Sequence, residues 1–245
     1  MIGIIGGSGL TRLACLEATH REVVRTPYGE PSAPATMGKV CGHDVVFLPR
    51  HGPSHTIPPH EVNYRANIWA LHKLGVSQVI AVAAVGSITG LSDCGIMIPD
   101  QIIDYTHSRE HTFFSGGDKT VTHVDFTEPY CESLRHKLIA GLGILESETR
   151  SSGTYGATQG PRFETSAEIR RMERDGVDIV GMTGMPEAVL AREIGLCYAT
   201  VAVSVNAAAG KGDGIISLKE VERNLEQGMA NVRKLLETVI PGLER

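Results

Sequence analysis

The chain has 245 residues, of which 42% are apolar and 21% charged, and its formal net charge is −5. These values are ordinary for a folded globular protein and suit one large domain, which we expect to span residues 1–245. The acidic balance, without a basic stretch, argues against nucleic acid as a partner.

The cysteines and the N-terminus bear on the cellular compartment. The five cysteines are odd in number, scattered and without a C-x-x-C pair, which argues against a disulfide framework and a zinc knuckle. No basic region precedes the first apolar residues, and the longest apolar run, 79–85, is too short to cross a bilayer. We therefore expect a cytoplasmic enzyme without membrane contact. The cysteines are Cys15, Cys41, Cys94, Cys131 and Cys197.

The chain opens with a predicted buried strand, Ile2–Ile5, and a glycine-rich turn, Gly6-Gly7-Ser8-Gly9. Such a turn lets the backbone approach a phosphate closely. Neither the dinucleotide spacing G-x-G-x-x-G nor a following Lys-Ser/Thr is present, so the two common nucleotide fingerprints are excluded. A tight turn without a ligand is the alternative.

A predicted strand pair, Lys39–Pro49, ends directly before Arg50 and His51. The planar guanidinium suits phosphate and the imidazole could add a donor, with a surface ion pair as the alternative for Arg50. Two further histidines, His55 and His60, invite a metal hypothesis. Prolines between them break any helix and few carboxylates are near, so we expect no metal.

Strands and helices then alternate, which predicts a mostly parallel α/β fold. The strand 78–85 is apolar without alternation, as in a sheet covered on both faces, and it ends in the small residues Ala84-Val85-Gly86-Ser87. The segment 107–126 reads as a loop. The other predicted elements are helices at 62–74, 131–142, 167–174 (capped by Ser166) and 217–239, and strands at 96–105 (broken at Pro99), 154–158 and 197–206.

The centre of the pattern is the stretch Asp178–Gly195, read as a strand, a turn and a helix. Thr183 lies in the turn, Pro186 suits the first helical turn, and Gly195 ends the helix. Ligands of α/β proteins bind at such strand ends, and helix N-termini attract anions. The alternative is that Thr183 only caps the helix.

Six stretches together resemble the family of trimeric purine nucleoside phosphorylases, in the branch acting on methylthioadenosine and methylthioinosine. They are GGSGL, TPYGEPSAP, RHG with HxxPPHxVNYRAN, AVGS, TQGPRFET and MTGMPEAVLARE. The resemblance implies a single nucleoside phosphorylase-like domain with a mixed, mostly parallel sheet between helices. It implies a homotrimer, or a dimer of trimers, that cleaves purine nucleosides with inorganic phosphate as co-substrate and no cofactor.

The resemblance also implies roles for individual residues. Met182 would lie beside the ribose, Phe163 and Thr165 near the purine, and His123 (with Phe126) at a neighbouring subunit's site. Catalysis would depend on Asn206, Thr183 and His51. The phosphate cradle would comprise Gly6, Ser8, Arg50, His51, Ala84 and Thr183.

The sequence departs from the adenine-specific members of this family at the residues that select the base. Those members carry two aspartates at the end of the penultimate strand. Asn206 and Ala208 stand at those places, with Ala207 between them. An amide can donate to O6 or N7 of a 6-oxopurine, and Glu164 matches a glutamate that accepts from N1–H. The alternatives are a buried turn residue for Asn206 and a helix-start carboxylate for Glu164.

At the 5′ position, Leu218 falls where relatives acting on ordinary nucleosides use a histidine. A shift of the alignment would place Ser217 or Ile216 there, and Leu218 could instead only pack the helix on the core. We expect phosphorolysis of 5′-methylthioinosine to hypoxanthine and 5-methylthioribose 1-phosphate. The alternatives are inosine or guanosine as substrate, then methylthioadenosine, then a purine-binding protein without catalysis.

Overall fold

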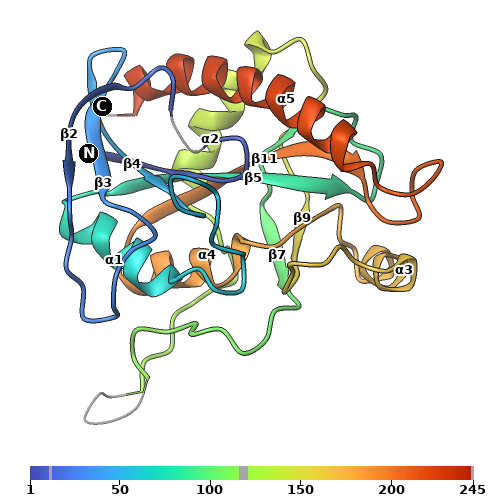
Figure 1. The fold of residues 1–245 in the computed structure, drawn as a ribbon, viewed down its shortest axis with the longest axis horizontal. Helices are drawn as coiled ribbons and strands as arrows, with labels where there is room; N and C mark the ends of the chain where they lie inside the picture. Colours follow the sequence, from blue (N-terminus) through green and yellow to red (C-terminus); the bar gives the residue numbers. More distant parts are fainter. Residues whose placement is uncertain (11–12, 116–120, 244–245) are drawn as a thin grey trace.

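The computed structural model describes residues 1–10, 13–115 and 121–243. In these ranges eleven strands form one mixed sheet with helices on both faces (Figure 1). Six of the ten strand pairings are parallel, which confirms the predicted fold class. The strands are β1 Ile2–Gly6, β2 Glu17–Glu22, β3 Ala35–Val40, β4 His43–Pro49, β5 Gln78–Ser87, β6 Ile96–Met97, β7 Gln101–Asp104, β8 Thr149–Arg150, β9 Thr154–Ala157, β10 Ile179–Gly181 and β11 Cys197–Ala207. The helices are α1 Tyr64–Lys73, α2 Glu132–Gly141, α3 Ser166–Arg174, α4 Gly184–Glu193 and α5 Leu218–Val239.

Strand β5 is the centre of the sheet. Its first half pairs in parallel with β1 and its end pairs antiparallel with β10, while β11 runs parallel along its whole length. The pairing of β5 with β11 shifts register between Ser204 and Asn206. Irregularities of this kind re-aim side chains next to active sites. Here the shift sets the position of Asn206 at the end of the strand.

Two apolar layers hold the helices on the sheet. Helices α1 and α4 cover one face, and α2 and α5 the other (Figure 1). Successive β5 residues pack on opposite faces of the sheet. Val79 and Ala81 belong to the core on the side of α1 and α4, and Ile80 and Val82 belong to the core on the side of α2 and α5. This double coverage explains why the strand lacks polar alternation.

Several element boundaries differ from the predictions. Thr165, not Ser166, caps α3: its hydroxyl accepts from Glu168 N–H, and the Glu168 carboxylate accepts from Thr165 N–H. This reciprocal capping box outcompetes a single cap at the next residue. Strand β2 escaped prediction because all six of its residues are exposed and carry no apolar pattern.

The cysteine prediction was wrong for one pair. Cys131 and Cys197 form a disulfide, with Cα atoms 5.1 Å apart and a sequence separation of 66 residues. Cys131 caps α2 and Cys197 begins β11, and the Cys131 N–H donates to the Tyr198 carbonyl at 2.8 Å. The fold thus joins two residues whose spacing in the sequence gives no signal. Over the ranges given above, no helix combines the length and apolar character needed to span a bilayer.

Candidate active site

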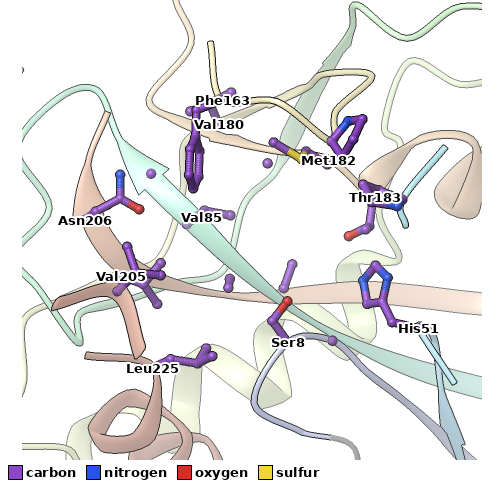
Figure 2. A pocket seen from close by; sticks show the side chains of 18 of the residues that line it. Ser8, His51, Val85, Phe163, Val180, Met182, Thr183, Val205, Asn206 and Leu225 are labelled. Atoms are coloured by element: carbon purple, nitrogen blue, oxygen red, sulfur yellow. The ribbon is translucent and has the colours of Figure 1, made fainter. Parts of the chain in front are cut away.

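A cavity of about 470 Å³ opens where several strand ends and the first turns of α5 meet (Figure 2). The turn after β1, the end of β4, the second half of β5, the β10–α4 junction and the end of β11 all contribute side chains. This is the edge at which open α/β sheets bind ligands. Of the predicted site residues it is lined by Ser8, Arg50, His51, Ala84, Phe163, Glu164, Met182, Thr183, Asn206, Ala208 and Leu218.

Ser8, His51 and Thr183 lie together at one end of this cavity (Figure 2). Thr183 is buried and stands at the N-cap of α4, yet its hydroxyl makes no capping hydrogen bond. Regular helical geometry begins only at Pro186, because Met185 has φ −118° and ψ 140°. The structure thus gives Thr183 no capping hydrogen bond, and its hydroxyl lies in the cavity lining near the Tyr155 hydroxyl.

The glycine turn brings backbone close to Arg50. A Cβ atom on Gly7 would lie 2.6 Å from the Val82 carbonyl oxygen and 3.0 Å from Arg50 Nη1. Only glycine leaves room for this approach. Gly6 is needed for packing instead, since a Cβ there would meet the Leu10 carbonyl at 2.1 Å.

Arg50 is buried, not on the surface, and its guanidinium is held by Glu187. Nε and Nη2 donate to the two carboxylate oxygens at 2.7 Å each, and Nη1 donates to the Val82 carbonyl at 2.9 Å. Burial alone would lower the pKa of Arg50, but the Glu187 charge and these hydrogen bonds raise it above its usual value. Tyr198 also donates to Glu187, at 2.9 Å. The cation is therefore fixed in orientation before any anion arrives.

His51 offers an acceptor to the cavity. Its Nδ1 lies 2.8 Å from the Ile57 carbonyl oxygen, which can only accept, so Nδ1 carries the proton. Burial and the nearby Arg50 lower the pKa of His51 to about 4, so the ring is neutral at pH 7 and Nε2 has a lone pair. The prediction of a further donor holds only for a protonated ring. A neutral ring suits the P–O–H group of hydrogenphosphate.

His55 was missed as a cavity residue by sequence reasoning. Its Nε2 lies 3.4 Å from the Ser8 hydroxyl, and its ring lies 4.7 Å from that of His51. His55 is the first residue of the motif H-x-x-P-P-H, which could have indicated a role in the site. It adopts a positive φ of 53° and lines the cavity. No cluster of three potential metal-binding side chains occurs within the described ranges.

The opposite end of the cavity carries the groups expected to face a purine (Figure 2). Phe163 is 43% exposed, so it does not serve as a core residue. The Asn206 amide nitrogen donates to the Ala207 carbonyl at 2.7 Å and keeps a second N–H. Glu164 accepts from the Thr158 hydroxyl at 2.6 Å. A hydrogen-bond donor (Asn206), an acceptor (Glu164) and an aromatic ring (Phe163) thus line the same end of the cavity.

A third region of the cavity is apolar and belongs to α5. Leu218, Val221 and Leu225 lie at i, i+3 and i+7 on one helix face, and Ile216 precedes them. Ser217 is the helix N-cap, its hydroxyl accepting from Glu220 N–H. Leu218 and Ile216 both line the cavity. Whichever of the two aligns with the histidine of other relatives, the side chain at that place is therefore apolar and faces the same cavity. Sequence reasoning missed Val221 and Leu225, although their helical spacing was visible.

Four predicted residues lie outside this cavity lining: Gly6, Thr165, Ala207 and His123. Thr165 uses its hydroxyl in the capping box, and Ala207 provides the carbonyl that holds Asn206. His123 is exposed. Its predicted role at a neighbouring subunit stays a prediction.

Comparison with known proteins agrees with this geometry. The profile of the phosphorylase superfamily matches residues 1–241. The chain belongs to the phosphorylase superfamily. This phosphorylase is 50% identical to a probable S-methyl-5′-thioinosine phosphorylase of Pseudomonas syringae pv. tomato, over 97% of both chains. It is 48% identical to the 6-oxopurine nucleoside phosphorylase of Pyrococcus furiosus, over 98% of this chain and 92% of the relative.

The fold of the phosphorylase also matches a solved structure. Methylthioadenosine phosphorylase from Schistosoma mansoni, in complex with adenine, superposes with a TM-score of 0.95 at 33% identity. The match covers 99% of this chain and 91% of that one. The predicted family and the nucleoside phosphorylase-like architecture are thereby confirmed.

Proposed function

We propose that the protein catalyses phosphorolysis of 5′-methylthioinosine, giving hypoxanthine and 5-methylthioribose 1-phosphate. An oxygen of hydrogenphosphate attacks C1′, the bond from C1′ to N9 breaks, and its electron pair leaves with the purine, which gains the proton given up by hydrogenphosphate. The phosphate dianion stabilises the positive charge that develops on the sugar. The names of relatives about half identical in sequence support this reaction class.

The polar end of the cavity supports the phosphate half of the reaction. Thr183 and Ser8 offer hydroxyls, and the Arg50 guanidinium keeps hydrogens beyond the three that it gives to Glu187 and Val82. Hydrogen bonds from a charged guanidinium to phosphate are roughly twice as strong as hydrogen bonds between neutral groups. Inorganic phosphate is therefore the proposed co-substrate, with no further cofactor.

The apolar face of α5 is the observation that carries the choice of substrate. Ile216, Leu218, Val221 and Leu225 offer no hydrogen-bonding group to a 5′-hydroxyl. An unpaired buried hydroxyl costs about 1–3 kcal/mol, whereas burial of a methylthio group is favourable by roughly 1 kcal/mol. The two effects add in a comparison, so we expect methylthioinosine to exceed inosine by tens-fold or more in kcat/KM.

Inosine and guanosine are the second candidate substrates. Relatives named 6-oxopurine nucleoside phosphorylases are 48% and 46% identical to this chain, close to the methylthioinosine group. A panel of methylthioinosine, inosine, guanosine and methylthioadenosine, each with and without phosphate, separates the candidates. Equal cleavage of inosine and methylthioinosine would favour the second candidate, and no phosphate-dependent cleavage of any would indicate a non-catalytic protein.

We also propose a homotrimer, or a dimer of trimers, in the cytoplasm. The cavity mouth supports neighbouring subunits, because Leu218 is 64% exposed and Phe163 43% exposed, an unusual setting for substrate-facing side chains. The exposed position of His123 suits a contact with a second copy. Light scattering tests the assembly, and a monomer that turns over substrate would contradict it.

A further inference from the structure

The Glu164 carboxylate is expected at the base end of the cavity, and within the described part of the chain only one of its oxygens accepts a hydrogen bond. Oε1 accepts from the Thr158 hydroxyl at 2.6 Å, and among the described residues no group donates to Oε2. Glu164 lines both the main cavity and a neighbouring one of about 560 Å³, which also contains Thr158. Because one oxygen is fixed, the other is available in a defined direction.

The hydroxyl of Thr158 has one hydrogen and two possible acceptors. The Gly181 carbonyl oxygen lies 3.3 Å away, compared with 2.6 Å for Glu164 Oε1. Carbonyl and ionised carboxylate oxygens only accept, so the hydrogen points to the nearer Glu164 oxygen. The Thr158 hydroxyl therefore fixes the position of Glu164 Oε1.

Thr158 itself is rigidly held. It follows the last residue of β9, is buried, and its N–H donates to the Gly181 carbonyl at 2.8 Å. Arg109 donates to the Thr158 carbonyl at 3.2 Å from the other side. Glu164, by contrast, lies in the loop before the cap of α3. The strand residue therefore provides the fixed reference for the loop carboxylate.

We infer that Thr158 is a positioning residue that makes Glu164 select 6-oxopurines over 6-aminopurines. The inference rests on the proposed function. An ionised Oε2 accepts from the N1–H of hypoxanthine or guanine, but it faces the lone pair of adenine N1. Removing the Thr158 hydroxyl frees the carboxylate to rotate away from the N1–H of the base, so discrimination falls.

Two isosteric comparisons isolate the hydroxyl. Thr158→Val preserves shape, and Thr158→Ser and Thr158→Ala differ from each other by one oxygen atom. The control is Thr154→Val on the same strand, whose side chain makes none of the hydrogen bonds described for Thr158. Calorimetry measures binding of hypoxanthine, adenine and inorganic phosphate to each purified protein.

We expect Thr158→Val and Thr158→Ala to weaken hypoxanthine binding about tenfold, the loss of one hydrogen bond to a charged group. Thr158→Ser and Thr154→Val should bind hypoxanthine like the wild type, and phosphate binding should be unchanged throughout. Undiminished hypoxanthine affinity in the Val and Ala variants, or equal losses for hypoxanthine and phosphate, would overturn the inference. A wild type that binds adenine as tightly as hypoxanthine would overturn the proposed base preference itself, and the inference with it.

Discussion

The buried pair of Arg50 and Glu187 makes a strong prediction about stability. Glu187→Gln keeps the size of the side chain and one acceptor oxygen, but it removes the charge that balances a guanidinium only 1% exposed. Breaking a buried ion pair by removing one partner costs about 3–5 kcal/mol. We expect a loss of this size in the free energy of unfolding, measured with urea.

A surface pair provides the matched control. Lys39 and Asp44 lie 2.8 Å apart with side chains 47% and 65% exposed, so Asp44→Asn also removes one carboxylate charge. Exposed pairs contribute only about 0–1 kcal/mol. The double variant Arg50→Met/Glu187→Leu should be more stable than Glu187→Gln, because it leaves no uncompensated charge.

The decisive assay compares the unfolding free energies of the two proteins with and without inorganic phosphate. In the wild type Glu187 already balances Arg50, whereas in Glu187→Gln a bound phosphate would be the counter-charge. Phosphate should therefore raise the unfolding free energy of the variant more than that of the wild type at the same concentration. The reasoning is refuted if Glu187→Gln is as stable as the Asp44→Asn control, or if phosphate stabilises the variant less than the wild type.

Three further predictions concern other parts of the molecule. The unfolding free energy should fall by about 3 kcal/mol between pH 6.5 and pH 4, because the pKa of His51 is about 6.5 in the unfolded chain and about 4 in the native protein. Urea titrations at several pH values measure this dependence, and His51→Gln should flatten it. Leu218→His should reduce the preference for methylthioinosine over inosine by about tenfold in kcat/KM, since the imidazole pairs the 5′-hydroxyl, while Ile215→His, outside the cavity, should not. Replacing Cys131 and Cys197 by alanine opens a link across 66 residues and should lower the unfolding free energy by up to about 4 kcal/mol; thermal melts with an unchanged midpoint would contradict it.

The sequence predicted most of the architecture because the signals were local. Apolar runs, glycine turns and helix ends located the strands and helices to within a few residues. The capping box at Thr165 was also local, since Thr165 and Glu168 have the required spacing, and choosing Ser166 overlooked it. Exposed β2 carried no such signal.

Pairings between distant residues were outside the reach of local patterns. Glu187 lies in the first turn of α4, where a negative charge is favourable in itself, yet its partner Arg50 is 137 residues away. The proton position on His51 depends on the Ile57 carbonyl, whose location depends on how the proline-rich loop folds back. The sequence alone identified the charged residues, but it could not show which acidic side chain pairs with which basic one.

Helix α5 shows why the apolar end of the site needed the tertiary structure. Its apolar stripe runs from Leu218 through Val221 and Leu225 to Leu236, with the same helical spacing throughout. Leu236 is completely buried in the core, whereas Leu218 is 64% exposed at the cavity mouth. The same apolar spacing thus packs the C-terminal turns on the core and, in the first turn, leaves a leucine for contact with a ligand. Val221 and Leu225 lie between these extremes, since they pack against the core and also line the cavity. The exposed Leu218, beside the polar end of the same cavity, marks where we expect a methylthio group to be buried.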